Sequence, residues 1–194
     1  MLISILLIFS AYLLGSVSAA IIVCKTLGLP DPRTGGSGNP GTTNVMRLYG
    51  KKAAFLTLVG DIFKGIIPVL LAKVIVNSEF IIAICGLTAF LGHIFPIYFK
   101  FEGGKGVATL IGILFATNWL LGISYITTWI LTALIFRYSS LAALIAALLI
   151  PIYSFFIEHN NQYTISFAVI AIILFWRHKS NIYNLLNGKE DKIW

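Results

Sequence analysis

Two glycine-rich segments carry most of the polar groups that could bind an anion. The first, residues 35–44, reads Gly-Gly-Ser-Gly-Asn-Pro-Gly-Thr-Thr-Asn. Glycines leave room for backbone N–H groups to converge on an anion, while Ser, Thr and Asn add neutral donors. The guanidinium of Arg47, just beyond it, can bind a phosphate bidentately. The segment predicts a phosphate site, with a flexible loop as the alternative. Its candidate residues are Ser37, Gly38, Asn39, Gly41, Thr43, Asn44 and Arg47.

The second segment is Gly-Gly-Lys-Gly at residues 103–106, directly before a long apolar run. A helix that begins here would place its partially positive N-terminus beside Lys105, which again favours phosphate. The segment is not a Walker A loop, because it lacks the earlier glycine and the following Ser or Thr. The G-x-G-x-x-G string at 36–41 is accidental, since it contains Pro40 and no strand–helix unit surrounds it. Gly103, Gly104 and Lys105 are therefore candidate phosphate ligands.

Ionisable side chains inside apolar runs form a second set of candidates. Asp61 and Lys64 are three residues apart, so they share a helical face. Ionised groups at membrane depth line a cavity or pair with each other. Lys64 is thus either a phosphate ligand or half of an ion pair that fixes the bundle. His93 and His178 could act as a general base, although a histidine near a span end is more often a structural hydrogen-bonding group.

Several catalytic patterns are missing from the sequence. No H-x-x-x-x-D string occurs, which disfavours acyltransferases that use thioester donors through a His–Asp pair. There is no run of spaced aspartates for two metal ions and no G-x-S-x-G nucleophile motif. Cys24 and Cys85 lie in apolar runs outside any C-x-x-C motif, so no disulfide, metal or cofactor is indicated. The chain offers phosphate-binding groups without a strong nucleophile.

The elements that position these residues must lie in a membrane. The 194 residues are 58% hydrophobic and 11% charged, with a mean hydropathy of +0.93, so lipid has to cover the apolar surface. No linker separates domains, and residues 1–194 are expected to form one domain. The net charge of +7 would suggest nucleic acid for a soluble protein. In a membrane protein it indicates cytoplasmic loops, anionic lipid headgroups or phosphate-bearing substrates, and no nucleic acid.

The apolar runs predict an all-α membrane protein. A signal peptide is the alternative for the first run, but no Lys or Arg precedes it. The fourth run has 30 residues and would be roughly 45 Å long as one helix, so a turn near residues 118–122 is expected to divide it. The runs are 1–24, 53–76, 80–99, 107–136, 141–157 and 163–176.

With that division the chain has seven transmembrane helices, an outer N-terminus and a cytoplasmic C-terminus. All 14 basic residues except Lys64 and Lys73 then lie on the inner side, as the positive-inside rule requires. The outer loops carry Glu79 and Glu158 and no basic residue. Four polar segments share the inner face and could form one site. A transporter of a phosphorylated metabolite is the alternative, but it would need an outward opening that the sparse outer loops do not suggest.

Six ordered motifs resemble a known family, the bacterial membrane acyltransferases that use acyl-phosphate to acylate glycerol 3-phosphate. The similarity runs from the first polar loop to the tail, and the motifs are residues 37–47, 60–65, 92–96, 103–109, 137–141 and 177–190. The resemblance implies a multi-pass protein of the bacterial cytoplasmic membrane. It would catalyse the first step of phospholipid synthesis and give lysophosphatidic acid and phosphate. The enzyme that makes acyl-phosphate would be a functional partner.

The same resemblance assigns roles by position. The catalytic residues would be Ser37, Arg47, Lys105, His178 and Asn181. The phosphate-binding residues would be Gly38, Asn39, Gly41, Thr43, Asn44, Lys64, Gly103, Gly104, Ser140 and Glu190, with Glu190 also supporting the tail. Two positions depart from the family, because Glu102 stands where Lys is frequent and Asn184 where Arg is frequent. Both departures remove positive charge at the rim of the expected site.

An acyl-phosphate is already activated, so no covalent acyl-enzyme is required. The protein has to align a hydroxyl with a carbonyl and neutralise two phosphates. The hydroxyl still needs a proton acceptor. His178, His93, Asp61 and the donor's own phosphate are the candidates, and substrate-assisted transfer is the preferred hypothesis.

Overall fold

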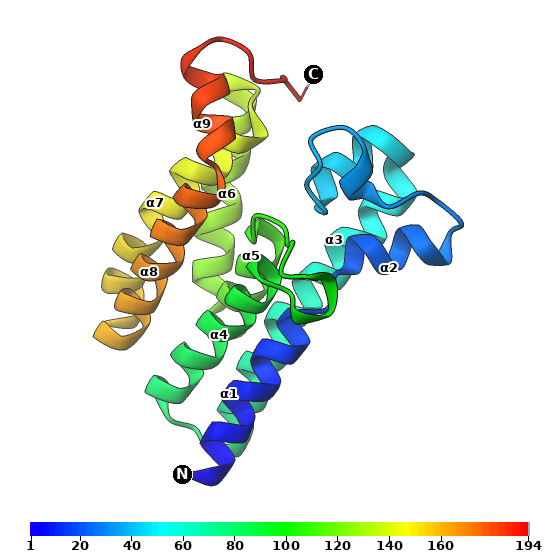
Figure 1. The fold of residues 1–194 in the computed structure, drawn as a ribbon. Coiled ribbons are helices and arrows are strands. Elements are labelled where there is room, and N and C mark those ends of the chain that lie inside the picture. Colours follow the sequence, from blue (N-terminus) through cyan, green and yellow to red (C-terminus); the bar gives the residue numbers. More distant parts are fainter. Residues whose placement is uncertain (194) are drawn as a thin grey trace. The chain divides into compact units, whose positions relative to one another are not determined.

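The computed structural model describes residues 1–193, and this part of the chain is helical with no β-strand (Figure 1). Apolar residues fill the helices, and the polar segments lie in the breaks between them. The α-helices are α1 (Leu2–Gly15), α2 (Ala19–Thr26), α3 (Thr42–Ile75), α4 (Glu79–Ile94), α5 (Val107–Thr117), α6 (Trp119–Phe136), α7 (Ser139–Glu158), α8 (Asn161–Arg177) and α9 (Lys179–Leu186). Two short 3₁₀ helices are η1 (Pro32–Thr34) and η2 (Ile97–Phe99).

The chain consists of two compact units, and the first comprises residues 1–116. In it α1 lies along α4, and α3 contacts both (Figure 1). Small residues allow this close approach, because a Cβ on Gly15 would collide with the Ala89 carbonyl and one on Gly92 with the Tyr12 carbonyl. Helices in lipid gain packing energy in this way, since lipid tails are as apolar as leucine.

The first apolar run is broken, although the sequence predicts one span over 1–24. The axes of α1 and α2 differ by 47° across residues 16–18. Such a break frees backbone carbonyls that lipid cannot satisfy. The Lys64 ammonium donates to the Val17 carbonyl at 2.8 Å. The Ser16 hydroxyl adds a bond of 2.9 Å to the Tyr12 carbonyl, which also accepts the Ser16 N–H. Polar side chains therefore donate hydrogen bonds to backbone carbonyls at the break. The pattern of apolar residues does not predict these bonds.

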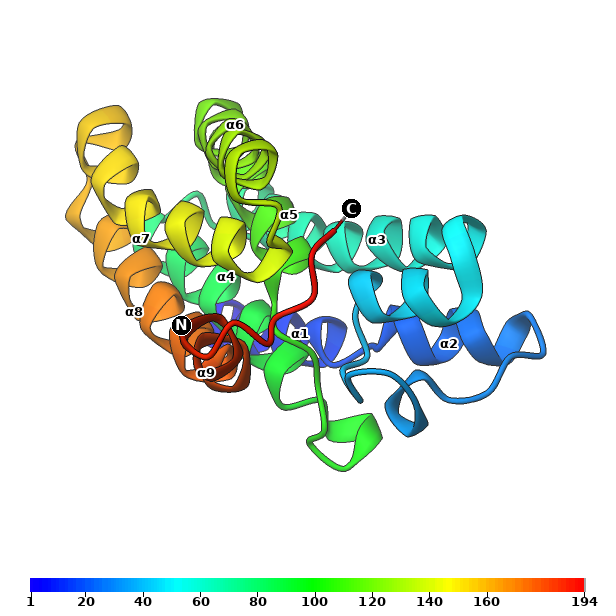
Figure 2. The ribbon, with the colours of Figure 1, turned by 90° about the horizontal axis from the view of Figure 1, so that it is seen from above.

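Helix α3 is two helical segments joined at Gly50, whose φ of 82° and ψ of −174° suit only glycine. The long segment after Gly50 contains the predicted span over 53–76. The shorter segment, Thr42 to Tyr49, carries the polar residues that follow the first glycine-rich loop. It packs on α2 (Figure 2) through a small apolar core that holds both flanks of the loop. That core comprises Ala20, Cys24, Val45, Ala53 and Ala54.

The second unit comprises residues 117–194 and contains α6 to α9. Within it α7 packs on both α6 and α8. The run over 107–136 is divided as predicted, because α5 ends at Thr117 and α6 begins at Trp119. Asn118 caps α6 by accepting the Leu120 N–H at 2.9 Å. Helix α9 departs from the axis of α8 by 60°.

Four helices of the described chain are long and apolar enough to cross a membrane: α3, α4 extended through η2, α6 and α7. The count rises to six when α1 with α2, and α8 with α9, are each taken as one bent span. Helix α5 is apolar but has only 11 residues. The protein is thus an all-helical, multi-pass membrane protein, and the seventh span stays a prediction.

Candidate active site

The first glycine-rich loop is built around the side chain of Asn44. Its Oδ1 accepts the Ser37 N–H at 2.9 Å, and its Nδ2 donates to the carbonyls of Pro32 at 2.8 Å and Gly35 at 3.1 Å. Gly36 has a φ of 58°, and a Cβ there would collide with Asn44 Oδ1. Asn44 is only 2% exposed. The Asn44 amide therefore holds the loop by hydrogen bonds inside the protein. This geometry does not support the phosphate-ligand role that the sequence predicts for Asn44.

The other candidates of the first loop face outward at the start of α3. Ser37, Thr43 and Arg47 are exposed, and Thr43 and Arg47 lie one helical turn apart on the same face. Gly41 is the N-cap and offers no side chain to the first amides of the helix. Uncapped N–H groups and the helix dipole give this end positive character. A hydroxyl, a guanidinium and helix amides at this end of α3 are groups that favour an anion.

The second glycine-rich loop follows η2 and packs closely against the end of α4. The Gly104 N–H donates to the His93 carbonyl at 3.2 Å. A Cβ on Gly103 would collide with that carbonyl, and one on Gly104 with Nε2 of the His93 ring. Both glycines are buried, whereas Lys105 between Gly104 and Gly106 is partly exposed. The loop thus presents one ammonium group at the start of α5.

Arg33 joins the two loops within the first unit. Its Nη1 lies 3.1 Å from Glu102 Oε2 and 3.4 Å from the Phe99 carbonyl. The rest of the guanidinium binds Asp31, with Nη2 at 2.8 Å from Oδ2 and Nε at 3.1 Å from Oδ1. The hydrogen bond from Arg33 lowers the pKa of Asp31. The acid at position 102 is therefore a partner of Arg33.

A buried polar cluster underlies the second loop. Lys64 Nζ lies 2.8 Å from Asp61 Oδ1, and the two side chains are 7% and 2% exposed. With its bond to the Val17 carbonyl, the ammonium is directed into the protein. Of the two sequence interpretations, the structural ion pair is the one observed, and the phosphate-binding role predicted for Lys64 has no support here. His93 Nδ1 completes the cluster at 3.7 Å from Asp61 Oδ1 and 3.1 Å from Thr109 Oγ1.

In the second unit, the Glu190 carboxylate ties the tail to two helices. Its Oε1 accepts from Ser140 Oγ at 2.6 Å and from Asn181 Nδ2 at 2.7 Å. The Ile193 N–H donates to the Arg137 carbonyl at 2.8 Å, so the tail folds back onto the start of α7. A carboxylate repels phosphate, so these contacts support a positioning role for Glu190 and not the predicted phosphate-binding role. Ser140 is engaged in the same contact.

His178 lies at the bend between α8 and α9 and is buried. Its Nδ1 lies 2.8 Å from the Leu174 carbonyl. That carbonyl can only accept a hydrogen bond, so Nδ1 carries the proton and the lone pair of the neutral ring is on Nε2. Any proton transfer by this histidine would use Nε2.

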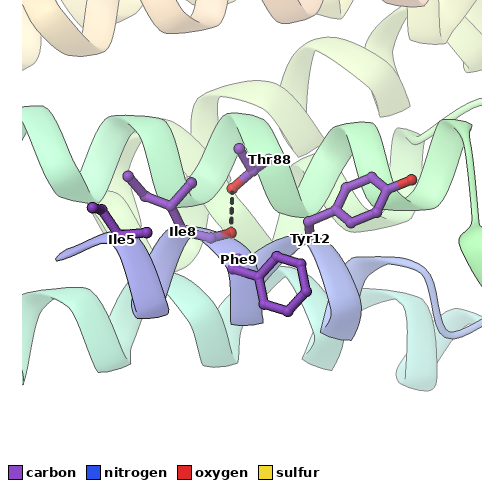
Figure 3. A pocket seen from close by; sticks show the side chains of 5 residues that line it. All are labelled: Ile5, Ile8, Phe9, Tyr12 and Thr88. Atoms are coloured by element: carbon purple, nitrogen blue, oxygen red, sulfur yellow. Dashed lines mark hydrogen bonds between the residues drawn. The ribbon is translucent and has the colours of Figure 1, made fainter. Parts of the chain in front are cut away.

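An apolar groove lies between α1 and α4 in the first unit (Figure 3). The hydroxyl of Thr88 is turned to backbone carbonyls, at 2.9 Å from Ile84 and 3.4 Å from Ile8. Tyr12 donates to the Phe95 carbonyl at 2.7 Å, in the segment that leads to the second loop. The surface left to a ligand is hydrocarbon, and it is formed by Ile5, Ile8, Phe9, Tyr12 and Thr88.

Among residues 1–193, no group of three or more His, Cys, Asp or Glu side chains is placed to hold a metal ion.

Comparison with known proteins identifies the family. A family model described as glycerol-3-phosphate acyltransferase matches residues 5–188. The glycerol-3-phosphate acyltransferase of Francisella tularensis subsp. novicida is 54% identical over 188 residues, covering 97% of this chain and 91% of that protein. The one of Hydrogenovibrio crunogenus is 49% identical over 187 residues, covering 96% and 90%.

Two solved structures agree with the sequence comparisons. One is the glycerol 3-phosphate form of PlsY (YgiH), an integral membrane glycerol 3-phosphate acyltransferase, with a TM-score of 0.94 at 36% identity over 98% of this chain and 96% of that one. Its lysophosphatidic acid form has a TM-score of 0.92 at 35% identity, covering 98% and 95%. The chain belongs to the glycerol-3-phosphate acyltransferase family.

Family membership confirms the resemblance drawn from the six motifs, and it decides for an acyltransferase against the transporter alternative. The structure brings the first and second loops of this acyltransferase together in one unit. It brings Ser140, Asn181 and Glu190 together in the other.

Sequence reasoning missed the residues that connect the acyltransferase's loops. Asp31 and Arg33 were not candidates. Two opposite charges two residues apart beside a glycine-rich segment do indicate an ion pair that can hold the loop in place. Thr109 was part of a motif but had no role, and its contact with His93 depends on helix packing.

Proposed function

We propose that this acyltransferase moves a fatty acyl group from acyl-phosphate to the 1-hydroxyl of glycerol 3-phosphate. The products are lysophosphatidic acid and inorganic phosphate, and the reaction begins phospholipid synthesis. The two PlsY structures support the acceptor and the product, because they are forms with glycerol 3-phosphate and with lysophosphatidic acid. Acyl-phosphate as donor rests on the chemistry of the site, which holds anions and offers no strong nucleophile.

The observation that carries this function is the pairing of two cationic glycine-rich loops through Arg33 and Glu102. One loop presents Ser37, Thr43 and Arg47 with helix amides, and the other presents Lys105. The reaction needs two phosphates beside each other, one on the donor and one on the acceptor. Backbone groups of Gly38, Asn39, Gly41, Gly103 and Gly104 complete the two loops.

The bond changes balance without a covalent intermediate. The acceptor oxygen attacks the acyl carbonyl carbon, the bond from that carbon to the phosphate oxygen breaks, and inorganic phosphate leaves. Negative charge develops on the carbonyl oxygen, where Arg47, Lys105 or a loop N–H stabilises it. The role of the protein is alignment and charge neutralisation.

The hydroxyl proton goes to the departing phosphate in this proposal. Three protein groups are alternatives: Asp61 and His93 are held in a buried cluster, and His178 could act only through Nε2. Asp61 is paired with Lys64, His93 Nδ1 contacts Thr109, and His178 Nδ1 contacts the Leu174 carbonyl. A phosphate oxygen already lies beside the reacting carbon, so substrate-assisted transfer needs no further group.

His178 and Asn181 belong to the same reaction in this proposal, with Ser140 and Glu190 setting the position of Asn181. The family model runs over residues 5–188 through both compact units, which supports one functional domain for the whole chain. The helices cross the bacterial cytoplasmic membrane seven times, with the N-terminus outside and both glycine-rich loops inside. The enzyme that makes acyl-phosphate is then a functional partner on the cytoplasmic side.

The acyl chain of the donor lies in the apolar groove between α1 and α4 (Figure 3). The Tyr12 end of the groove adjoins Phe95, from which the chain continues to the second loop. Phe9→Trp narrows the groove and should shift preference toward shorter acyl-phosphates, measured as kcat/KM for two chain lengths. Phe156→Trp, at an exposed position of α7, is the matched control. If the Phe9→Trp and Phe156→Trp variants have the same chain-length preference, this groove does not hold the acyl chain.

The decisive assay uses the purified protein in lipid nanodiscs with acyl-phosphate and glycerol 3-phosphate. The proposal expects phosphate release that depends on both substrates, with lysophosphatidic acid formed in equal amount. Activity with acyl-thioesters alone, or phosphate release independent of glycerol 3-phosphate, would contradict it.

A further inference from the structure

Four polar side chains from three helices meet beneath the second glycine-rich loop. Asp61 and Lys64 come from α3, His93 from α4 and Thr109 from α5, and all four are at least nine-tenths buried. Buried charges and polar groups in a membrane protein are expensive, so such a cluster needs a purpose beyond packing. None of these four residues belongs to the groups described above as favouring an anion.

The cluster is balanced in charge without His93. The Lys64 ammonium is 2.8 Å from Asp61 Oδ1 and donates to the Val17 carbonyl at 2.8 Å, so the carboxylate already has its counter-ion. A third charge on the imidazole would be uncompensated in a low-dielectric interior. The ring is therefore not needed as a counter-ion, and its contacts with Thr109 and the second loop define its place in the cluster.

The ring has a defined orientation. Nδ1 faces Asp61 Oδ1 at 3.7 Å and Thr109 Oγ1 at 3.1 Å. Nε2 faces the Cα of Gly104 so closely that a Cβ there would collide with it. One edge of the imidazole is thus held by the buried cluster, and the other edge supports the loop.

The backbone of the same residue holds the loop as well. The His93 carbonyl accepts the Gly104 N–H at 3.2 Å, and it occupies the space that a side chain on Gly103 would need. Lys105 follows directly, at the start of α5. The position of its ammonium group therefore depends on where His93 places the two glycines before it.

We propose that His93 is a positioning residue: anchored by the Asp61–Lys64 pair and Thr109, it holds the Gly103–Gly104 turn in the conformation that presents Lys105 to a phosphate. This inference rests on the proposed function of the second loop. The buried ion pair then contributes to substrate binding, because the His93 ring connects it to the loop that carries the partly exposed Lys105.

The test is a double-mutant cycle of His93→Asn and Gly104→Ala, with KM and kcat measured for both substrates. Asn keeps an amide near the position of Nδ1 and removes the Nε2 edge. Each single variant should raise KM for at least one phosphate substrate by about tenfold, the loss expected for a misplaced charged hydrogen bond, while kcat changes less. In the double variant the Cβ of Ala fills the space vacated by the ring, so the effects should be clearly less than additive.

A matched control separates positioning from general stability. Cys85→Ala removes a buried thiol from the same helix. It should lower Tm and leave both KM values unchanged. A folded His93→Asn enzyme with unchanged KM and strongly reduced kcat would assign His93 to proton transfer and overturn the proposal. Strictly additive effects in the cycle would also overturn it.

Failure of the proposed function is distinguishable from failure of this inference. If the unmodified protein does not turn over acyl-phosphate with glycerol 3-phosphate, the function itself is wrong. If it does, and the His93 and Gly104 variants retain its KM values, only the positioning role is wrong.

Discussion

Individual side chains in this acyltransferase are divided between those that face a ligand and those that hold the loops. Asn44 was a candidate ligand as a polar donor in a glycine-rich segment, and Glu190 was one by its position in a family motif. Both use their hydrogen-bonding capacity inside the protein, Asn44 on three backbone groups and Glu190 on two side chains. Polar residue type predicts that a bond is made, and packing decides with which partner.

Asn44 provides a direct test at this scale. Asn44→Ala removes three hydrogen bonds from the first loop and should raise KM for a phosphate substrate by about tenfold to a hundredfold, at about 1 kcal/mol per bond. Asn44→Asp should be worse, since a carboxylate would face the Pro32 and Gly35 carbonyls. The control is Asn187→Ala, which removes an exposed amide bonded to the Tyr183 carbonyl. Equal KM values in the Asn44 and Asn187 variants would show that the loop does not depend on this amide.

At the scale of elements, breaks and bends position the chemistry. The sequence predicts one uninterrupted span over residues 1–24, and the structure bends it at residues 16–18. The kink at Gly50 lies just before the predicted span over 53–76. Each interruption frees backbone groups that side chains or glycine geometry must accommodate. The short helical segment before Gly50 carries Thr43 and Arg47, so its direction decides where they point.

Gly50→Ala tests that dependence. A side chain at φ 82° and ψ −174° is strained even though nothing lies within 4 Å of the added Cβ, and the strain is about 1–3 kcal/mol. We expect a lower Tm together with a raised KM, because relief of the strain redirects the segment that carries Arg47. Gly28→Ala, at another positive φ in open space, should lower Tm without moving KM. An unchanged KM for Gly50→Ala would show that the kink does not affect substrate binding.

The Asp31–Arg33–Glu102 link between loops predicts a pH dependence. Because Arg33 lowers the pKa of Asp31 below its ordinary 3.8, the folded state favours the ionised acid. The stabilisation is complete above 3.8 and is lost as pH falls through the lowered value. It should be about 1 kcal/mol or less, since both groups are partly exposed.

Thermal unfolding from about pH 7 to about pH 3 would check it. Asp31→Asn should have a slightly lower Tm than the unmodified protein at neutral pH, and the difference should shrink as pH falls below 3.8. A Tm difference between the two proteins that grows as pH falls would contradict the predicted direction of the pH dependence.

At the scale of the whole molecule, charge asymmetry predicts the orientation in the membrane. With 14 basic and 7 acidic residues, the excess is concentrated in segments that the positive-inside rule assigns to the cytoplasm. Anionic substrates and anionic lipid headgroups are attracted to the same face.

Cysteine labelling tests this orientation. In a Cys24→Ala, Cys85→Ala background, Lys52→Cys and Lys100→Cys should react with a membrane-impermeant maleimide only from the cytoplasmic side. His159→Cys, between α7 and α8, should react only from outside. All three positions are exposed in the folded chain. Labelling of positions 52 and 100 from opposite sides would end the proposed function, because the two loops would then not share a face.

The sequence by itself determined the membrane class, the division of the long run near residues 118–122, the family and the position of the two glycine-rich loops. These depend on composition, apolar run length and local residue type, which act along the chain. Only the tertiary structure decided that Lys64 pairs with Asp61, that Asn44 and Glu190 hold loops, and that Arg33 joins the first loop to the second. Those outcomes depend on which groups helix packing brings within about 3 Å of each other, since a hydrogen bond or ion pair forms only at contact.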